Sequence, residues 1–112
     1  MYKVFITQHF KKQLRILCKK DAALKENFIK TFETFNVLLA AKISGNIYKI
    51  RLKKNNRGKS AGYRVYIFLL KRNDLLTPVC IYEKNEKVTL NLSELNKHMK
   101  QTLVELQNIS GY

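Results

Sequence analysis

The segment that decides the fold is residues 47–70, which read IYKIRL at Ile47–Leu52, KKNNRGKSAG at Lys53–Gly62 and YRVYIFLL at Tyr63–Leu70. The first part alternates apolar and basic side chains, which is the period-two pattern of a strand with one buried face. The last part is a nearly continuous apolar run, typical of a strand near the middle of a sheet. The polar, glycine-containing stretch between them is expected to be a loop.

Alternation along the first of these strands separates its side chains into two sets. One set should face the core of the domain, and the other set should carry positive charge on the opposite side of the sheet. The core-facing set is expected to be Tyr48, Ile50 and Leu52, and the basic set Lys49, Arg51 and Lys53.

Downstream of this segment, Asn73-Asp74 indicates a turn, and Leu75–Tyr82 is predicted to be a further strand. Pro78 has no amide proton to donate to a neighbouring strand, so it predicts a sheet edge, a bulge or a local bend. After a loop at Glu83–Asn91, Ser93 is predicted to cap a final helix. The inward side chains of that helix are expected to be Leu95, Met99, Leu103 and Leu106.

Upstream of the deciding segment, Tyr2–Ile6 predicts a short strand of aromatic and β-branched residues. Thr7 is expected to cap a first helix, and Asp21 is expected to start a second. Both helices show apolar side chains at helical spacing, which we interpret as core. These stripes are Phe10, Leu14 and Leu17 in the first helix, and Leu24, Phe28, Phe32, Phe35 and Leu39 in the second.

The predicted order is therefore one strand, two helices, three strands with hairpin-scale connections, and one helix. This order favours an α+β fold with a three-strand antiparallel meander over a doubly wound sheet. We expect residues 1–112 to form a single domain. One layer of helices would cover one face of the sheet and leave the other face, or part of it, for function.

The charge of the chain is strongly asymmetric. Twenty-two Lys and Arg against 8 Asp and Glu give a formal net charge of +14, which is tolerated chiefly when the partner is a polyanion. Nucleic acid is the leading candidate, ahead of an anionic membrane or an acidic protein, although charge alone does not separate RNA from DNA. No acidic residue occurs between Glu33 and Asp74. That interval contains Lys42, Lys49, Arg51, Lys53, Lys54, Arg57, Lys59, Arg64, Lys71 and Arg72.

The two cysteines, Cys18 and Cys80, form no CxxC pair and have no clustered histidines around them. We expect them to be free thiols that pack as small hydrophobes, and we expect no metal site. The apolar run after Lys3 is too short for a secretory signal, and no stretch approaches the length that spans a membrane. A cytoplasmic location with no membrane partner is therefore expected.

Three motifs occur in the order seen in the RelE/ParE superfamily of bacterial toxins. They are YKIRL at Tyr48–Leu52, RGKSAGYRVYIF at Arg57–Phe68 and CIYEKNE at Cys80–Glu86. Within this superfamily the chain resembles the HigB group most closely. The likeness covers most of the chain, because the predicted order of helices and strands fits as well.

This resemblance implies the toxin of a type II toxin–antitoxin module. Toxins of the RelE kind bind in the ribosomal A site and cut messenger RNA, which inhibits translation. The family uses no metal and no other cofactor: a ribose 2′-hydroxyl attacks the adjacent phosphate. The implied partners are the ribosome, its messenger RNA and a cognate antitoxin, which in the HigB group is usually a helix-turn-helix DNA-binding protein.

The resemblance also implies roles for four cationic residues. Attack by a 2′-hydroxyl needs a base, cations for the developing phosphorane and an acid for the leaving oxygen. Arg51 stands where RelE itself has lysine, and arginine remains protonated, so Lys49 is our preferred proton acceptor. Arg64 is expected to clamp the scissile phosphate, and Lys84 to stabilise the transition state or protonate the leaving group. Further RNA contacts are predicted for Lys53, Lys54, Arg57, Lys59, Tyr82 and Asn85.

The chain also departs from RelE near its C-terminus. RelE has a base-stacking tyrosine near its C-terminus, whereas Val88–Leu92 contains no aromatic residue. Tyr82 or Tyr112 is an alternative for this role. Packing, structural or solvated roles are expected for His9, His98, Tyr48 and Tyr66.

Two other functions remain open. A ParE-like toxin would keep the fold but poison DNA gyrase, and such members typically lack the cationic set. A noncatalytic RNA- or DNA-binding module would explain the charge without cleavage. The presence of Lys49, Arg51, Arg64 and Lys84 favours the ribonuclease.

Overall fold

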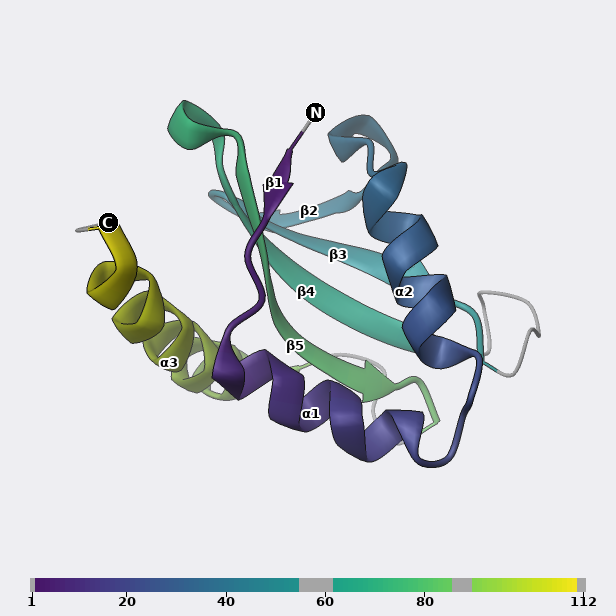
Figure 1. Ribbon diagram of the computed structural model, residues 1–112. Helices are drawn as coiled ribbons and strands as arrows, with labels where there is room; N and C mark the ends of the chain where they lie inside the picture. The colour runs from purple at the N-terminus through teal and green to yellow at the C-terminus, as the bar shows by residue number, and fades with distance from the viewer. Residues whose placement is uncertain (1, 55–61, 86–89, 111–112) are drawn as a thin grey trace.

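The fold is a mixed α+β domain built on one sheet, as the sequence predicts (Figure 1). The computed structural model describes residues 2–54, 62–85 and 90–110. No helix in this part of the chain has the length and apolar character needed to cross a membrane. The elements are β1 (Lys3–Val4), α1 (Gln8–Cys18), α2 (Leu24–Glu33), a 3-10 helix (Val37–Leu39), β2 (Ala41–Ser44), β3 (Ile47–Leu52), β4 (Tyr63–Leu70), a second 3-10 helix (Lys71–Asn73), β5 (Leu75–Glu83) and α3 (Leu92–Ser110).

The sheet has five strands in the order β1-β5-β4-β3-β2. Strands β2 to β5 form an antiparallel meander, and β1 pairs with β5 in parallel. The predicted three-strand meander is therefore one strand too short, because β2 was missed. All four residues of β2 are exposed, so Ala41–Ser44 has no buried face to produce the alternation that marks a strand.

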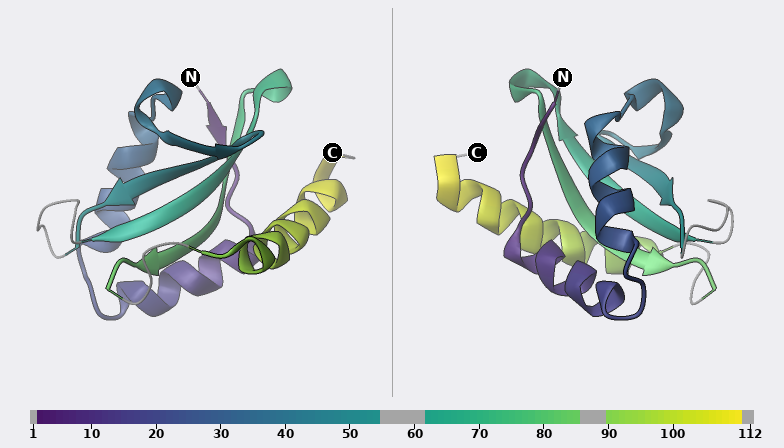
Figure 2. Two further views of the ribbon diagram at one scale, coloured as in Figure 1. Left: turned by 180° about the vertical axis from the view of Figure 1, so that it is seen from behind. Right: turned by 45° about the vertical axis from the view of Figure 1, so that its right-hand side comes forward.

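Helices lie on both faces of the sheet (Figure 2). On one face, α1 and α2 cover a core that includes Ile50 of β3 and Val65 and Ile67 of β4. On the other face, Leu95 of α3 packs against Tyr66 and neighbouring residues of β5. The face opposite α1 and α2 is thus covered near β5 and partly uncovered along β3, where Arg51 is exposed.

The N-terminal segment begins largely as expected. The predicted strand at Tyr2–Ile6 shrinks to Lys3–Val4, and Thr7 caps α1 by accepting a hydrogen bond from the Phe10 amide at 3.0 Å. Phe10 and Leu17 are buried, with Leu14 partly buried against the same core.

The second helix starts later and ends earlier than predicted. It begins at Leu24, and Asp21 lies before it, where its carboxylate accepts hydrogen bonds from the Ala23 amide (3.0 Å) and the buried Tyr63 hydroxyl (3.1 Å). It ends at Glu33, so the predicted stripe loses its helical register and Leu39 is 85% exposed. Leu24, Phe28 and Phe32 are buried as predicted, and Phe35 only partly.

The C-terminal helix corrects two predictions. Asn91, and not Ser93, is its N-cap: the Asn91 side chain accepts from the Glu94 amide at 2.8 Å, and Glu94 accepts from the Asn91 amide at 3.4 Å. Leu103 is 40% exposed, whereas Thr102 is fully buried. Two helical turns of about 3.6 residues each lead from the buried Leu95 to position 102. Thr102 therefore faces the core, and Leu103 does not.

Pro78 lies at a bulge in β5, one of the three sites predicted for it. Tyr66 pairs with Cys80 and Ile67 with Pro78, so Val79 is an extra residue in β5. The side-chain amide of Gln13 in α1 fills the place of a neighbouring strand here. Its Nε2 donates to the Val79 carbonyl oxygen (3.3 Å), and its Oε1 accepts from the Ile81 amide (3.1 Å).

Cys18 and Cys80 are free thiols, as predicted. Cys80 lies in β5 and is buried in the cluster that includes Leu95 of α3. Burial raises the pKa of its thiol to about 12. A thiol with such a pKa stays protonated and unreactive near neutral pH.

Candidate functional site

Two rows of side chains cross β3, β4 and β5 on the face opposite α1 and α2. In the first row Arg51 pairs with Arg64, which pairs with Tyr82. In the second row Lys49 pairs with Tyr66, which pairs with Cys80. Directly opposed residues on one face have Cβ atoms about 4.5–5.5 Å apart, so the pairing brings the predicted cations together.

Arg64 is the fixed member of the arginine pair. Its side chain is 5% exposed, and its Nη1 donates to the Tyr63 carbonyl oxygen at 3.2 Å. Burial, and then the nearby Arg51 guanidinium, lower the pKa of Arg64. Arg51 is exposed by contrast. The two arginines therefore concentrate positive charge beside each other, an arrangement that an anion placed against them would stabilise.

Two tyrosines, Tyr66 and Tyr82, pack beside the arginines on the same face of the sheet. The Tyr66 and Tyr82 rings lie with centroids 6.0 Å apart, and the Lys49 Nζ lies 5.7 Å from the Tyr66 ring centroid. Burial and a hydrogen bond to Tyr66 raise the pKa of Tyr82. Tyr66 also accepts a hydrogen bond from the Leu90 amide at 3.4 Å. Tyr66 is thus a packing residue, as expected. Tyr82 lies in the same row as Arg51 and Arg64, but it is only 8% exposed.

Lys84 and Asn85 lie just after β5, and both are exposed. The Lys84 amide donates to the Gly62 carbonyl oxygen at 3.0 Å. This bond holds the backbone of Lys84 next to the start of β4, two residues before Arg64.

The predicted RNA-binding lysines differ in their surroundings. Lys53 is exposed, whereas the Lys54 ammonium forms a 2.5 Å ion pair with the Glu83 carboxylate. Glu83 is 6% exposed, so the charge of Lys54 is largely balanced at the end of the sheet. The predicted contacts Arg57 and Lys59 lie outside the described residues.

Gly62 lets the ends of β3 and β4 approach closely. A Cβ atom on Gly62 would lie 1.9 Å from the Leu52 carbonyl oxygen, which is far inside van der Waals contact. Only glycine fits this position without movement of the backbone.

A cavity at the edge of β3 was not predicted from the sequence. It has a volume of about 440 Å³, and Lys49 and Arg51 line it together with Thr31, Thr34 and Asn36 of α2 and the segment after it. Threonine and asparagine near the end of a helix are usually solvated, so these residue types do not predict a binding cavity. The missing information was that β3 continues past the end of β2.

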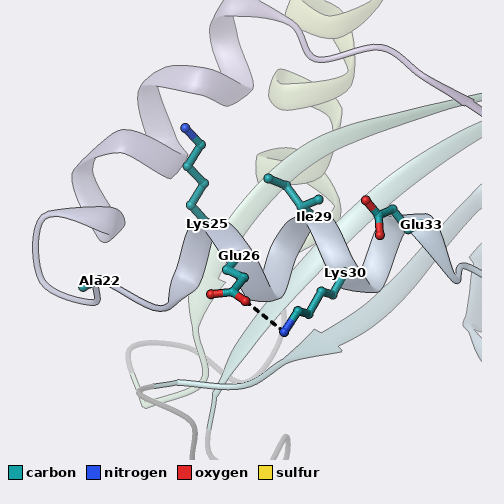
Figure 3. Close-up of a pocket in the computed structure, with 6 residues that line it drawn as sticks. All are labelled: Ala22, Lys25, Glu26, Ile29, Lys30 and Glu33. Atoms are coloured by element: carbon teal, nitrogen blue, oxygen red, sulfur yellow. Dashed lines mark ion pairs between the residues drawn. The ribbon is translucent and has the colours of Figure 1, made fainter.

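A second hollow, of about 410 Å³, lies on the outer side of α2 (Figure 3). Both signs of charge surround it, and Lys30 and Glu26 form a 2.9 Å ion pair across one helical turn. None of the predicted site residues line it.

The two histidines join α1 to α3. His9 Nε2 and His98 Nδ1 lie 2.7 Å apart, and the Glu105 carboxylate accepts from the amides of Gln8 (2.7 Å) and His9 (3.0 Å). Burial lowers the pKa of His9, while Glu105 opposes the shift. Both histidines therefore have the structural role expected for them. Within the described residues, no cluster of three or more His, Cys, Asp or Glu side chains is arranged to hold a metal ion.

Comparison with known proteins gives a family match over nearly the whole chain. The model of the family described as "RelE toxin of RelE / RelB toxin-antitoxin system" matches residues 2–110. No curated protein sequence matches significantly.

Solved structures share the fold at low sequence identity. A solution structure of the conserved hypothetical protein HP0892 from Helicobacter pylori is 19% identical, with a TM-score of 0.53, and the match covers 77% of this chain and 98% of that one. A mutant E. coli toxin RelE in the free state is 16% identical, with a TM-score of 0.54 and coverage of 87% and 92%. The isolated E. coli RelE toxin is 14% identical, with a TM-score of 0.53 and coverage of 91% and 99%.

Proposed function

The chain belongs to the RelE toxin family, and on that premise we propose that it is an endoribonuclease that cuts messenger RNA in the ribosomal A site. Membership makes it the toxin of a toxin–antitoxin system, with an antitoxin as partner. The proposal adds the substrate, the site and the chemistry. The chain, as one domain, would inhibit translation in the cytoplasm, with messenger RNA and the ribosome as its partners.

The observation that carries the proposal is the row in which Arg51 opposes Arg64 across β3 and β4, with Lys49 beside it on the same face. Two adjacent guanidinium groups give a planar, multidentate site for a phosphate. Such a pair stabilises the extra negative charge of a pentacoordinate phosphorane more than that of the starting diester.

The proposed step transfers one proton at each end. Lys49 accepts the proton of the 2′-hydroxyl, whose oxygen then bonds to phosphorus. The bond from phosphorus to the 5′-oxygen breaks, and Lys84 protonates that oxygen. The products are a 2′,3′-cyclic phosphate, which hydrolyses to a 3′-phosphate, and a 5′-hydroxyl. No metal or cofactor enters this scheme.

The finer partner assignment is also part of the proposal. We place the chain in the HigB group on the three sequence motifs, and we expect its antitoxin to be a helix-turn-helix DNA-binding protein. The RNA contacts predicted for Lys53, Lys54, Arg57, Lys59, Tyr82 and Asn85 belong to the same proposal. Lys54 would first have to release Glu83.

Purified toxin, ribosomes and a defined messenger RNA test the proposal. We expect cuts at codon spacing only when ribosomes are present, with the stated end groups and no loss of activity in EDTA. A folded Arg64→Ala, Lys84→Ala double variant should not cut. Gyrase-linked DNA breaks on induction would instead indicate a ParE-like toxin, and binding without cutting would indicate a noncatalytic module.

A further inference from the structure

A groove of mixed polar and apolar lining runs between α2 and the outer edge of β3. The pairing of β2 with β3 reaches only to Ala41 opposite Lys49, so within the described residues Ile50–Leu52 has no neighbouring strand on that side. Two hollows of about 440 and 190 Å³ adjoin there and share Thr31 and Thr34 in their lining. Together they form one groove.

The two walls of the groove differ in chemistry. The helix wall carries Asn27, Lys30 and Thr31 of α2 and Thr34 directly after the helix, and Phe35, Asn36 and Leu39 continue the lining. The strand wall of the two hollows is lined by Lys49, Ile50 and Arg51 of β3 and by Lys53 just after it. No Asp or Glu is among the described residues that line either hollow.

Hydrogen-bonding groups remain available on the helix wall. Asn27 Nδ2 is buried without a partner among the described residues, so it does not face the open groove, and the available groups belong to residues further along this wall. The Thr34 hydroxyl donates to the Lys30 carbonyl oxygen (3.1 Å), which leaves its oxygen as an acceptor. Asn36 Oδ1 accepts from the Leu38 amide (2.9 Å), and the Asn36 amide protons are not used in that bond.

We propose that this groove binds the single-stranded RNA that flanks the scissile phosphate. Phosphates would contact the strand wall, and base edges would contact the threonines and Asn36 of the helix wall. Lys49 and Arg51 line both the groove and the cationic face, so one continuous RNA strand can pass from the arginine pair around the edge of β3. This inference rests on the proposed function, because the scissile phosphate is placed by the arginine pair.

The wall chemistry favours nucleotides over a protein segment. A row of cations without carboxylates matches a phosphate backbone. The hydroxyl and amide groups of Thr31, Thr34 and Asn36 match the edges of unpaired bases.

The test measures binding to a short single-stranded RNA whose 2′-hydroxyls are methylated, so that it cannot be cut. Fluorescence anisotropy at several salt concentrations gives the dissociation constant and its salt dependence. A Thr31→Val, Thr34→Val variant keeps side-chain volume but removes two hydroxyls, and we expect roughly tenfold weaker binding with an unchanged salt slope. Lys53→Gln should reduce the slope by about 0.7, the value for one phosphate contact on a single strand.

Lys100→Gln is the matched control for charge, because Lys100 is exposed on α3 and does not line the groove. It should leave the slope unchanged. If the double threonine variant binds RNA as tightly as wild type, the groove is not an RNA-binding site, even if messenger RNA is still cut. Binding by wild type without any cutting on ribosomes would leave the groove in place and remove the proposed function. If the threonine variant loses affinity for the antitoxin and not for RNA, the groove holds a protein segment and the inference is wrong.

Discussion

Along β4, side chains alternate between an apolar face under α1 and α2 and a cationic face that carries the candidate site. Tyr63, Val65 and Ile67 belong to the core, and none is more than 1% exposed. Arg64 and Tyr66, the residues between them, point to the opposite face. Neighbouring residues of one strand therefore serve stability and function separately.

This difference shows how closely the site depends on strand register. A shift of one residue would exchange the two faces, placing Arg64 in the core and Val65 in the site. The close approach at Gly62 and the extra residue at Val79 help to fix the register at two points. Substitutions on the two faces should therefore have separable effects.

The largest effect is expected on the cationic face. Arg64→Met keeps the apolar stem and removes the charge, so cleavage should fall by about 10²–10³-fold, the usual cost of losing one preorganised charge stabiliser. The thermal midpoint should fall only modestly, because relief of the repulsion with Arg51 offsets part of the loss of the buried hydrogen bond to the Tyr63 carbonyl. Single-turnover cleavage on ribosomes and thermal denaturation measure the two quantities. A fully active Arg64→Met variant would contradict the assignment.

Gly62 should affect both faces at once. Gly62→Ala forces the backbone at Leu52 and Lys54 to move, and we expect a loss of about 3 kcal/mol in unfolding free energy, the upper range for overpacking. Cleavage should also fall, because Arg64 and Lys84 are both held near Gly62. Urea denaturation checks the first expectation. Gly45→Ala is the control, since nothing lies within 4 Å of its added Cβ, although its φ of +52° adds a smaller strain.

A substitution on the core face should lower stability and leave activity almost unchanged, which is the opposite of the effect expected at Arg64. Val65→Ala removes two buried methyl groups and should lower the unfolding free energy by about 2 kcal/mol. Specific cleavage activity at low temperature, per folded molecule, should stay within twofold of wild type, roughly the additivity error for independent sites. A large loss of activity in a stably folded variant would show that the faces are not separable.

The smallest effect is expected at the contact between α1 and α3. The folded state holds His9 with a pKa below its ordinary value of 6.5, with His98, Glu105 and Lys12 around it. The folded state thus binds fewer protons than the unfolded state, so stability is full above about pH 6.5 and declines as the pH falls below it. Urea denaturation between pH 7.5 and 5 should show a small decline. A His9→Gln, His98→Gln variant should show less of it.

The sequence predicted the elements whose two faces differ in polarity. The bounds of β3 and β4 were predicted correctly, because alternation and a continuous apolar run each report burial directly. β2 has no buried residue, and a strand without burial leaves no pattern to detect. The start of α2 was misplaced by three residues: Asp21, a good capping residue by type, accepts from the Ala23 amide and from Tyr63 across the core, and the helix begins only at Leu24.

The same limit applies to the site. Lys49, Arg51 and Arg64 could be placed on one face from antiparallel pairing alone. The wall formed by Asn27, Thr31 and Thr34 could not, because it depends on where β2 stops and how α2 lies over β3. The low exposure of Arg64 and the ion pair of Lys54 with Glu83 also depend on tertiary packing.

The side-chain amide of Gln13 has a consequence for how the molecule avoids self-association. Beyond the two residues that β1 covers, β5 offers main-chain groups at Val79 and Ile81 that a foreign strand could use as a template for growth of the sheet. Gln13 occupies both groups, one as donor and one as acceptor, and the ring of Pro78 offers no amide proton nearby. Gln13, on a helix that packs against β5, therefore leaves these two main-chain groups unavailable to an added strand.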